Sequence, residues 1–444
     1  LFATACVLML PIIAQAQTLN IANNVQTAVT LTNTTVTMTG RSELSITGAD
    51  DPIPGCQINL NSPDAWFFMR NIRPSVVNST FLGRIRVNGA VGVLNGNLRI
   101  VQYESGAVVI PHGPQFAPLQ IFDGSHFTGP SKSLKLYTYH NETNLGILTA
   151  ATSSFKLKRG YMCTVAQQNT GTGSSKVYIA QDGDLEISVL PAALNNNIRY
   201  IRVFPWRWVS KKGWAGGDGG NINHHWNYGW DAGGNSNDLD SEYVPMRHGP
   251  WWPGFDEINA KQNVTHLLGY NEPDNTWDAA QTPQTVDQAI AQWPELMKSG
   301  LRLGSPAVTE GGLNSWLYPF IDRCDQLGYR VDFVAVHFYA PNQSAWQLHE
   351  LLRTISERTR RPVWLTEFNN GASWNDNVFN PTQAQNATRI NEFIDMMDGW
   401  APFVERYAIY NWVGDNRRMV WNGGALTVAG PVYKNQVSTP SQVQ

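Results

Sequence analysis

The hydrophobic and polar positions of the chain follow different patterns in its first and last parts. Residues 17–115 carry short alternating runs, such as 34–40 and 82–89, which glycine and proline interrupt. Alternation with a period of two and frequent turns predict short strands, so we expect a β-sandwich-like module here. Residues 206–434 instead alternate apolar runs with segments at helical spacing.

The pattern of residues 206–434 predicts a parallel sheet that is buried on both faces. Residues 267–271 and 331–338 form near-continuous apolar strands, and one later segment has the spacing of a buried helix face, at Ile390, Phe393, Ile394 and Met397. Alternating apolar strands and helices are typical of α/β folds. A region of about 230 residues suits a (β/α)8 TIM barrel, and a polar tail follows at 435–444.

Residues 118–205 lie between these regions and consist of two halves with a similar layout. The first half carries Phe122, Phe127 and Gly129, and the second keeps the rhythm of strands but lacks the aromatic pair. The layout resembles the βγ-crystallin Greek-key repeat. This resemblance implies a second all-β module in a multidomain chain. We do not expect a calcium site, because neither half has both the Asn or Asp pair and the hydroxyl pair that crystallin-type calcium loops use.

The first 16 residues have the features of a secretory signal peptide. An apolar run at 7–13 precedes Ala14-Gln15-Ala16, which has the form of a cleavage site. Because this run is too short to span a membrane, we expect a secreted protein, extracellular or periplasmic, rather than a membrane protein. Three cysteines then remain, and we expect buried free thiols, with a disulfide between Cys56 and Cys163 as the alternative.

Composition narrows the class of partner. Charged residues make up 15% of the 444 residues and the net charge is −3, whereas ordinary soluble domains carry about 25% charged residues. The basic residues are dispersed, which argues against nucleic acid and favours a neutral substrate. Every one of the 17 tryptophans except Trp66 lies at or beyond Trp206. The Trp-rich region is therefore where we expect the functional site.

Two glutamates stand at the ends of predicted apolar strands. Glu272 follows residues 267–271, and Glu367 follows residues 363–366. In a barrel the carboxyl ends of the strands share one pocket, and a buried carboxylate is costly without partners. The two could form a glycosidase pair, with one as acid and the other as nucleophile, about 5–5.5 Å apart in retaining enzymes. Alternatively, each could pair with Arg or Lys at the barrel rim.

The segments 267–274, 336–339 and 363–369 resemble the motifs of glycoside hydrolase family 128, the β-1,3-glucanases of clan A. The resemblance implies that Glu272, after the fourth strand, is the general acid/base, and that Glu367, on the seventh, is the nucleophile. This count takes residues 211–215, 225–230 and 243–246 as the first three strands. The resemblance also gives Asn271 a hydrogen bond to the sugar 2-hydroxyl.

Other side chains near the predicted strand ends are candidates for sugar binding. His337 and Tyr339 lie two positions apart, on the same side of their strand. Sugar rings present apolar C–H faces to aromatic platforms and hydroxyls to polar side chains. The remaining candidates are Asn227, Tyr228, Trp230, Asn369 and Trp412, of which we place Trp412 at subsite −1.

Together these observations predict a monomeric, secreted, retaining hydrolase of β-1,3-glucan. Acid/base and covalent catalysis by two side chains need no cofactor. We expect no metal site, because the adjacent His224 and His225 would face opposite sides of a strand. Two alternatives stay open, a clan A hydrolase of another β-linked polysaccharide and a protein that binds glycan without cutting it. The N-terminal modules could bind the same polysaccharide or act as spacers.

Overall fold

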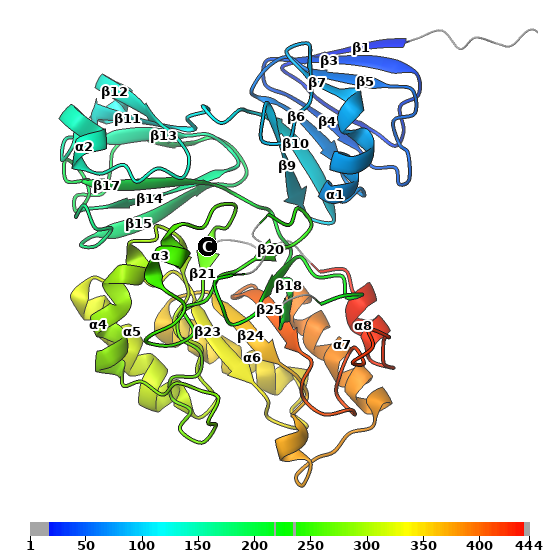
Figure 1. The fold of residues 1–444 in the computed structure, drawn as a ribbon, viewed down its shortest axis with the longest axis vertical. Coiled ribbons are helices and arrows are strands. Elements are labelled where there is room, and N and C mark those ends of the chain that lie inside the picture. Colours follow the sequence, from blue (N-terminus) through cyan, green and yellow to red (C-terminus); the bar gives the residue numbers. More distant parts are fainter. Residues whose placement is uncertain (1–16, 217–218, 234–236, 439–444) are drawn as a thin grey trace, which may run out of the picture. The chain divides into compact units, whose positions relative to one another are not determined.

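The computed structural model describes residues 17–216, 219–233 and 237–438, and its parts form a multidomain protein. The described residues 17–114 form one compact unit, and those from 115 to 438 form a second (Figure 1). The predicted signal peptide and the end of the predicted polar tail, from 439, lie outside the described residues. No helix within the described ranges is long and apolar enough to cross a membrane.

The first unit consists of two five-stranded sheets whose strands pair mostly in parallel. One sheet has the order β1 (Gln17–Ala22), β3 (Thr34–Thr39), β5 (Gln57–Leu60), β7 (Ile85–Val87) and β8 (Ala90–Val91). The other has the order β2 (Val25–Ala28), β4 (Ser42–Ile46), β6 (Ala65–Met69), β10 (Gly106–Pro111) and β9 (Leu98–Tyr103). Only the last pairs, which involve β8, β9 and β10, are antiparallel.

This pairing corrects the predicted β-sandwich. Successive strands β1 to β7 alternate between the two sheets, so each pairs with the strand two positions along, as in the coils of a solenoid. Turns with positive φ at Asn23 and Asn33 help to stack the coils. A Cβ at Gly40 or Gly55 would lie 2.1 Å from the Oδ1 atom of Asn23 or Asn33 respectively, so only glycine fits there. The alternating pattern predicts which side chains face inward, but it does not predict whether neighbouring strands pair in parallel or antiparallel.

Residues 115–205 form two antiparallel sheets. The first has the order β12 (Thr128–Leu134), β11 (Leu119–Gly124), β13 (Ser154–Leu157) and β16 (Leu185–Ile187), and the second β15 (Ser175–Ala180), β14 (Tyr161–Ala166) and β17 (Tyr200–Pro205). A short helix, α2 (Glu142–Leu145), follows β12. An all-β module is therefore present here, and its likeness to βγ-crystallins stays a prediction. Cys56, Cys163 and Cys324 are buried free thiols, so the alternative of a Cys56–Cys163 disulfide is wrong.

In the described part of residues 206–438, eight parallel strands follow one another in a closed order. They are β18 (Lys212–Ala215), β19 (Trp226–Tyr228), β20 (Glu242–Tyr243), β21 (His266–Leu267), β22 (Arg302–Leu303), β23 (Val334–Phe338), β24 (Val363–Phe368) and β25 (Val404–Tyr410). Six pair in the order β20-β19-β18-β25-β24-β23, and β21 pairs with β22. The parallel bridges Met246–Leu268 and Gly304–Phe333 join the two sets. We call this arrangement the closed sheet.

Helices connect these strands and flank the closed sheet (Figure 1). They are α3 (Phe255–Asn259), α4 (Val286–Met297), α5 (Tyr318–Leu327), α6 (Ala345–Thr359), α7 (Gln383–Gly399) and α8 (Gly430–Asn435). Capping boxes at Thr285, Ser344 and Thr382 start α4, α6 and α7, because each hydroxyl accepts the N–H three residues later. The apolar positions predicted from helical spacing are the buried face of α7.

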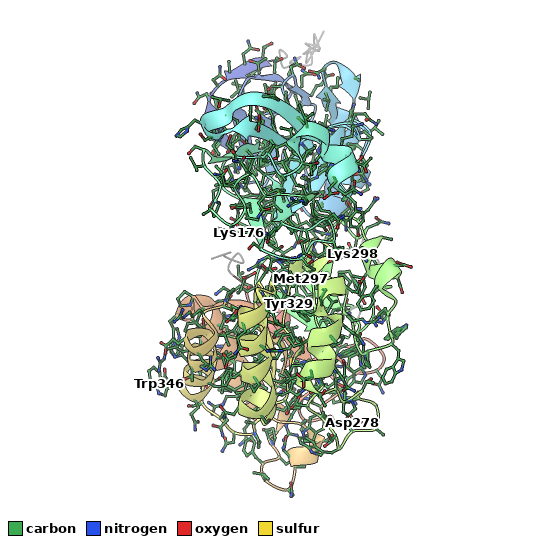
Figure 2. The ribbon with its side chains drawn as sticks, turned by 90° about the vertical axis from the view of Figure 1, so that its left-hand side faces the viewer. Lys176, Asp278, Met297, Lys298, Tyr329 and Trp346 are labelled. Carbon is green, nitrogen blue, oxygen red and sulfur yellow. The ribbon has the colours of Figure 1, made fainter. Side chains whose placement is uncertain are left out.

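The module at 115–205 packs against the end of α4, so these two parts form one unit. Tyr200 donates a hydrogen bond to the carbonyl of Lys298 (2.6 Å), and Thr164 donates to the carbonyl of Gly300 (2.6 Å). Figure 2 labels Met297 and Lys298 at this end of the helix. These buried contacts join the module to the part of the chain that carries the predicted glutamates.

Candidate active site

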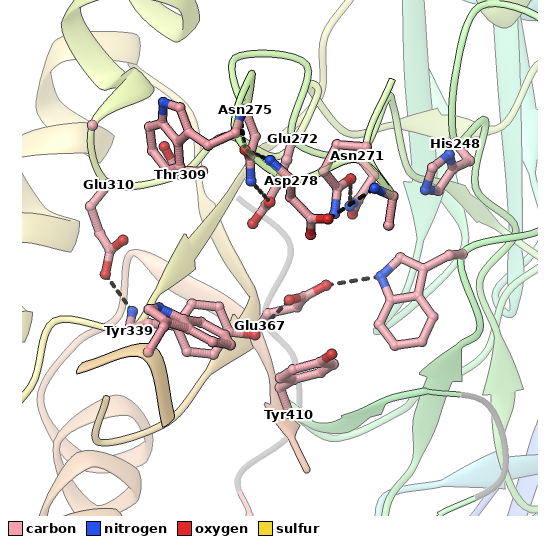
Figure 3. Close-up of a pocket in the computed structure, with 16 residues that line it drawn as sticks. His248, Asn271, Glu272, Asn275, Asp278, Thr309, Glu310, Tyr339, Glu367 and Tyr410 are labelled. Atoms are coloured by element: carbon pink, nitrogen blue, oxygen red, sulfur yellow. Dashed lines mark hydrogen bonds between the residues drawn. The ribbon is translucent and has the colours of Figure 1, made fainter. Parts of the chain in front are cut away.

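A cavity of about 690 Å³ opens at the carboxyl ends of the strands of the closed sheet (Figure 3). Both predicted glutamates, Glu272 and Glu367, line it. Among the described residues, those that line it are Trp230, His248, Asn271, Glu272, Asn275, Trp277, Asp278, Ala280, Gln281, Thr309, Glu310, Gly311, Tyr339, Glu367, Trp374 and Tyr410.

Glu367 lies near the end of β24 and accepts three hydrogen bonds from neutral donors. Tyr228 (3.1 Å) and the indole N–H of Trp230 (2.9 Å) donate to Oε1, and Tyr339 (2.5 Å) donates to Oε2. Burial and the neighbouring Glu367 charge raise the pKa of both tyrosines well above 10, so both stay protonated donors. These three hydrogen bonds therefore fix the carboxylate in place without an arginine or a lysine.

Glu272 lies beyond β21, in a backbone conformation with φ of 37°. His337 donates from Nδ1 to its Oε1 (2.7 Å), and Asn275 donates from Nδ2 to its Oε2 (2.8 Å). Burial alone would raise the pKa of Glu272, but the hydrogen bonds and the charge of His337 hold this pKa below its usual value. Since a non-glycine residue seldom has positive φ, the backbone here is strained.

His337 connects the two carboxylates. Its Nδ1 is 2.7 Å from Glu272 and 3.6 Å from Oε2 of Glu367. Burial lowers the pKa of His337, but Glu367 and Glu272 together raise it to about 9. The imidazole is thus positively charged at neutral pH. Oxygen atoms of the two carboxylates approach within 4.8 Å of each other.

The same three side chains offer ligand atoms within 4.8 Å of one another, which is close enough to hold a metal ion. A metal ligand must be a neutral imidazole, however, whereas His337 is protonated at neutral pH. The proton on His337 therefore already balances part of the negative charge of Glu272 and Glu367. A metal ion would have to displace this proton, which lies between His337 and Glu272.

The alternative prediction, that Glu272 and Glu367 each pair with an Arg or Lys at the rim, does not fit their surroundings. Among the described residues that line the cavity there is no Arg or Lys. Two other glutamates of the closed sheet do have such partners, since Arg406 lies 2.9 Å from Glu242 and Arg302 forms a bidentate pair with Glu405. The sheet therefore carries two glutamates that pair with arginine, and two whose partners are amide, phenol, indole and imidazole groups.

Three further predicted residues line the cavity, namely Asn271, Trp230 and Tyr339. Asn271 donates to Oε1 of Gln281 (2.9 Å), while its own Oδ1 is buried without a partner. Tyr228 is fully buried below the cavity and reaches Glu367 from there. Trp412 is half exposed and does not line the cavity, although its ring lies 6.1 Å from that of Trp230.

Two predicted residues have their side chains elsewhere. The Asn227 amide lies 3.3 Å from Nε2 of His224. Asn369 is fully buried and donates to the carbonyls of Tyr410 (2.9 Å) and Arg417 (3.1 Å). Neither lines the cavity, so both brace loops rather than face a ligand there. A position at a strand end therefore did not suffice to identify a binding residue.

Sequence reasoning missed Asn275, Asp274 and Glu310. Asp274 accepts hydrogen bonds from the backbone and hydroxyl of Thr309, and so ties the Glu272 loop to the loop after β22. Glu310 accepts the backbone N–H of Tyr339, and burial raises its pKa. Glu310 could have been proposed from the sequence, because it follows the fifth strand of the closed sheet, as Glu272 follows the fourth. Asn275 contacts Glu272 only through a tight turn, which the sequence does not reveal.

Comparison with protein families gives one match to this part of the chain. Residues 204–433 match the family described as glycosyl hydrolase catalytic core. No curated protein matches the chain.

Several solved structures are similar to the second half of the chain. An endo-β-1,3-glucanase of glycoside hydrolase family 128 subgroup I from Amycolatopsis mediterranei, in complex with laminaripentaose, is 30% identical over 51% of this chain and 98% of its own (TM-score 0.46). A curdlan-specific exo-β-1,3-glucanase of subgroup III from Blastomyces gilchristii is 28% identical over 51% of this chain and 98% of its own (TM-score 0.41). An oligosaccharide-binding protein of subgroup VII from Trichoderma gamsii is 23% identical over 51% of this chain and 93% of its own (TM-score 0.42).

Proposed function

We propose that this chain, which belongs to the glycosyl hydrolase catalytic core family, is a secreted, retaining β-1,3-glucanase. It is a glycoside hydrolase, and its sequence identity of 30% to an almost complete family 128 enzyme confirms the resemblance to that family. The proposed substrate follows from this identity, since the matched relative is an endo-β-1,3-glucanase.

The proximity of the two glutamates is the observation that carries the proposed mechanism. Their oxygens approach within 4.8 Å, which supports the retaining arrangement of about 5–5.5 Å over the inverting one of about 6.5–9.5 Å. In the inverting geometry a water would need to fit between the second carboxylate and the sugar. The short separation favours direct attack by a carboxylate instead.

We assign the nucleophile to Glu367 and the acid/base to Glu272. Oε of Glu367 attacks the anomeric carbon, while Glu272 gives a proton to the leaving glycosidic oxygen. Glu272 then takes a proton from the water that cleaves the glycosyl–Glu367 bond. His337 holds a proton at Nδ1, 2.7 Å from Glu272, and is placed to supply the proton that Glu272 gives to the leaving oxygen. The proton that Glu272 later takes from water restores the starting state. Tyr228, Trp230 and Tyr339 keep Glu367 aligned for attack.

The proposal includes the fold and the location of the protein. We propose that the closed sheet is a (β/α)8 barrel, since its parallel pairing runs through all eight described strands and returns to its start. Glu272 then follows the fourth strand and Glu367 lies on the seventh, as in clan A. Secretion rests on the apolar run and the Ala-Gln-Ala site near the start of the sequence.

The test combines product analysis with stereochemistry. We expect the protein to release reducing ends from β-1,3-glucan, and the first-formed anomer, followed by proton NMR, to be β. If the protein released reducing ends from β-1,4-glucan, xylan or mannan instead, the proposed substrate would be wrong and the proposed mechanism would stand. Tight binding of laminaripentaose without any product would overturn the proposed activity and leave a glycan-binding protein.

A further inference from the structure

Two tryptophans stack on each other at the flank of the closed sheet, outside the cavity. Trp346, at the start of α6, is 60% exposed, and Trp400, just after α7, is 45% exposed. Their ring centroids lie 6.1 Å apart, and the ring planes differ by 18°. Figure 2 labels Trp346 at the outer edge of this part of the molecule. Neither indole lines the cavity.

Other rings hold this pair in place from below. His349 is buried and stacks on Trp346 (5.4 Å between centroids) and on Trp400 (4.6 Å). Phe403 packs edge-on against His349 at 5.1 Å. Two exposed indoles on a buried aromatic base form a preorganised platform, because the rings lose little further freedom when a ligand binds.

Polar side chains continue from the platform along α6. Glu350 lies next to His349, 3.0 Å from Nδ1, and Arg353 pairs with Glu350 at 2.7 Å and with Glu357 at 2.6 Å. These carboxylates and this guanidinium are all exposed to solvent in part. The surface therefore places hydrogen-bond acceptors and donors beside an apolar face.

We propose that Trp346, His349 and Trp400 form a second glycan-binding site, which takes a chain of the proposed β-1,3-glucan substrate. A pyranose ring has an apolar C–H face and a rim of hydroxyls, which match the indoles and the polar groups of α6 respectively. A stable protein partner would instead cover about 800 Å² per side, which is far more than two half-exposed indoles offer. The cavity proposed to bind the same glucan is likewise lined by tryptophans, namely Trp230, Trp277 and Trp374.

The site would act by keeping an insoluble chain near the active site. Binding at one place makes binding at the other effectively intramolecular and so increases the local concentration of substrate. This advantage disappears for short soluble oligosaccharides, which cannot reach both places. The inference rests on the proposed function for the identity of the glycan.

The experiment compares insoluble and soluble substrates with the full chain. In a Glu272→Gln background, which prevents turnover, we expect the double variant Trp346→Ala/Trp400→Ala to bind insoluble β-1,3-glucan about tenfold more weakly. In the active background the same double variant should lose hydrolysis of insoluble glucan and keep its kcat/KM on soluble laminaripentaose. The matched control is Trp346→Phe/Trp400→Phe, which keeps aromatic rings and should retain most of the binding.

Each outcome decides between the two proposals. Unchanged binding and hydrolysis of insoluble glucan by the double alanine variant, with an unchanged melting temperature, would overturn the second site. An equal loss on laminaripentaose would also overturn it, since the substitutions would then act on the active site or the fold. A wild-type protein that cleaves neither substrate would contradict the proposed function, while the comparison of binding would still test the platform.

Discussion

The closed sheet buries two pairs of glutamates, and their surroundings differ. Glu242 and Glu405, near the amino ends of β20 and β25, contact Arg406 and Arg302. Burial would raise the pKa of Glu242, but Arg406 and His266 hold this pKa well below its usual value. Glu272 and Glu367, near the carboxyl ends, contact amide, phenol, indole and imidazole groups instead.

The difference separates a structural role from a chemical one. A buried carboxylate paired with arginine cannot readily gain a proton or attack carbon, because its charge is held by a partner that never deprotonates. Phenol and indole donors align Glu367, and the imidazole beside Glu272 can give up its proton, so neither carboxylate is held by a group that never deprotonates. The surroundings of the arginine-paired glutamates suit a role in stability, whereas those of the other pair suit the proposed chemistry.

Replacement of Glu367, the proposed nucleophile, should have the largest effect. We expect Glu367→Ala to lower kcat on β-1,3-glucan by roughly 10⁴-fold or more, since no other group forms the covalent intermediate. Glu367→Gln should lose as much activity and keep the melting temperature of the wild type, because the amide retains an acceptor for its donors. Activity within tenfold of wild type in either variant would make the assignment wrong.

Glu272→Gln should lower kcat by about 10²- to 10⁴-fold on natural glucan, because the leaving oxygen then departs without a proton. On an aryl glycoside with an acidic phenol as leaving group, the first step needs no such proton and should be much less affected. Steady-state kinetics on both substrates check this. An equal loss on both would mean that Glu272 is not the acid.

Replacement of an arginine that pairs with a buried glutamate should lower the stability of the protein. Arg302→Met removes the partner of the buried Glu405 and should lower the free energy of unfolding by about 3–5 kcal/mol, measured by urea denaturation. The double variant Arg302→Met/Glu405→Met leaves no uncompensated charge and should recover much of this loss. A single variant as stable as wild type would contradict the structural role of the pair.

Tyr339→Phe tests the neutral donors. Its hydroxyl donates to Glu367 at 2.5 Å, and removal of one hydrogen bond to a charged group should lower kcat/KM by about tenfold. The ring stays, so KM should change less than kcat. Trp412→Phe, which alters a residue outside the cavity lining, provides the comparison and should change kcat less.

The smallest effect concerns pH. The pKa of His337 is raised from 6.5 to about 9, despite burial, by Glu367 and Glu272. A raised histidine pKa gives stability that is fully present below pH 6.5 and is lost as the pH rises through about 9. We therefore expect the melting temperature to decrease across this window, and the decrease to become shallower in His337→Gln. Identical pH profiles of the two proteins would show that His337 does not carry this charge.

Much of the second half of the chain could be predicted because its signals are local. Apolar runs such as 363–366 became buried strands, and the 390–397 spacing became the buried face of α7. The first half was harder. Its alternation predicted strands with buried and exposed faces, whereas parallel pairing of β1 with β3 depends on how residues 23–33 turn between sheets.

The candidate site divides in the same way. The sequence by itself determined that two glutamates end buried strands and that tyrosine and tryptophan surround them, because strand order in a parallel sheet brings carboxyl ends together. Only the tertiary structure decided that Glu310 and Asn275 face the cavity while Asn227 and Asn369 do not. Those orientations depend on loop conformations and on partners distant in the sequence, such as Arg417 for Asn369, which no local pattern encodes.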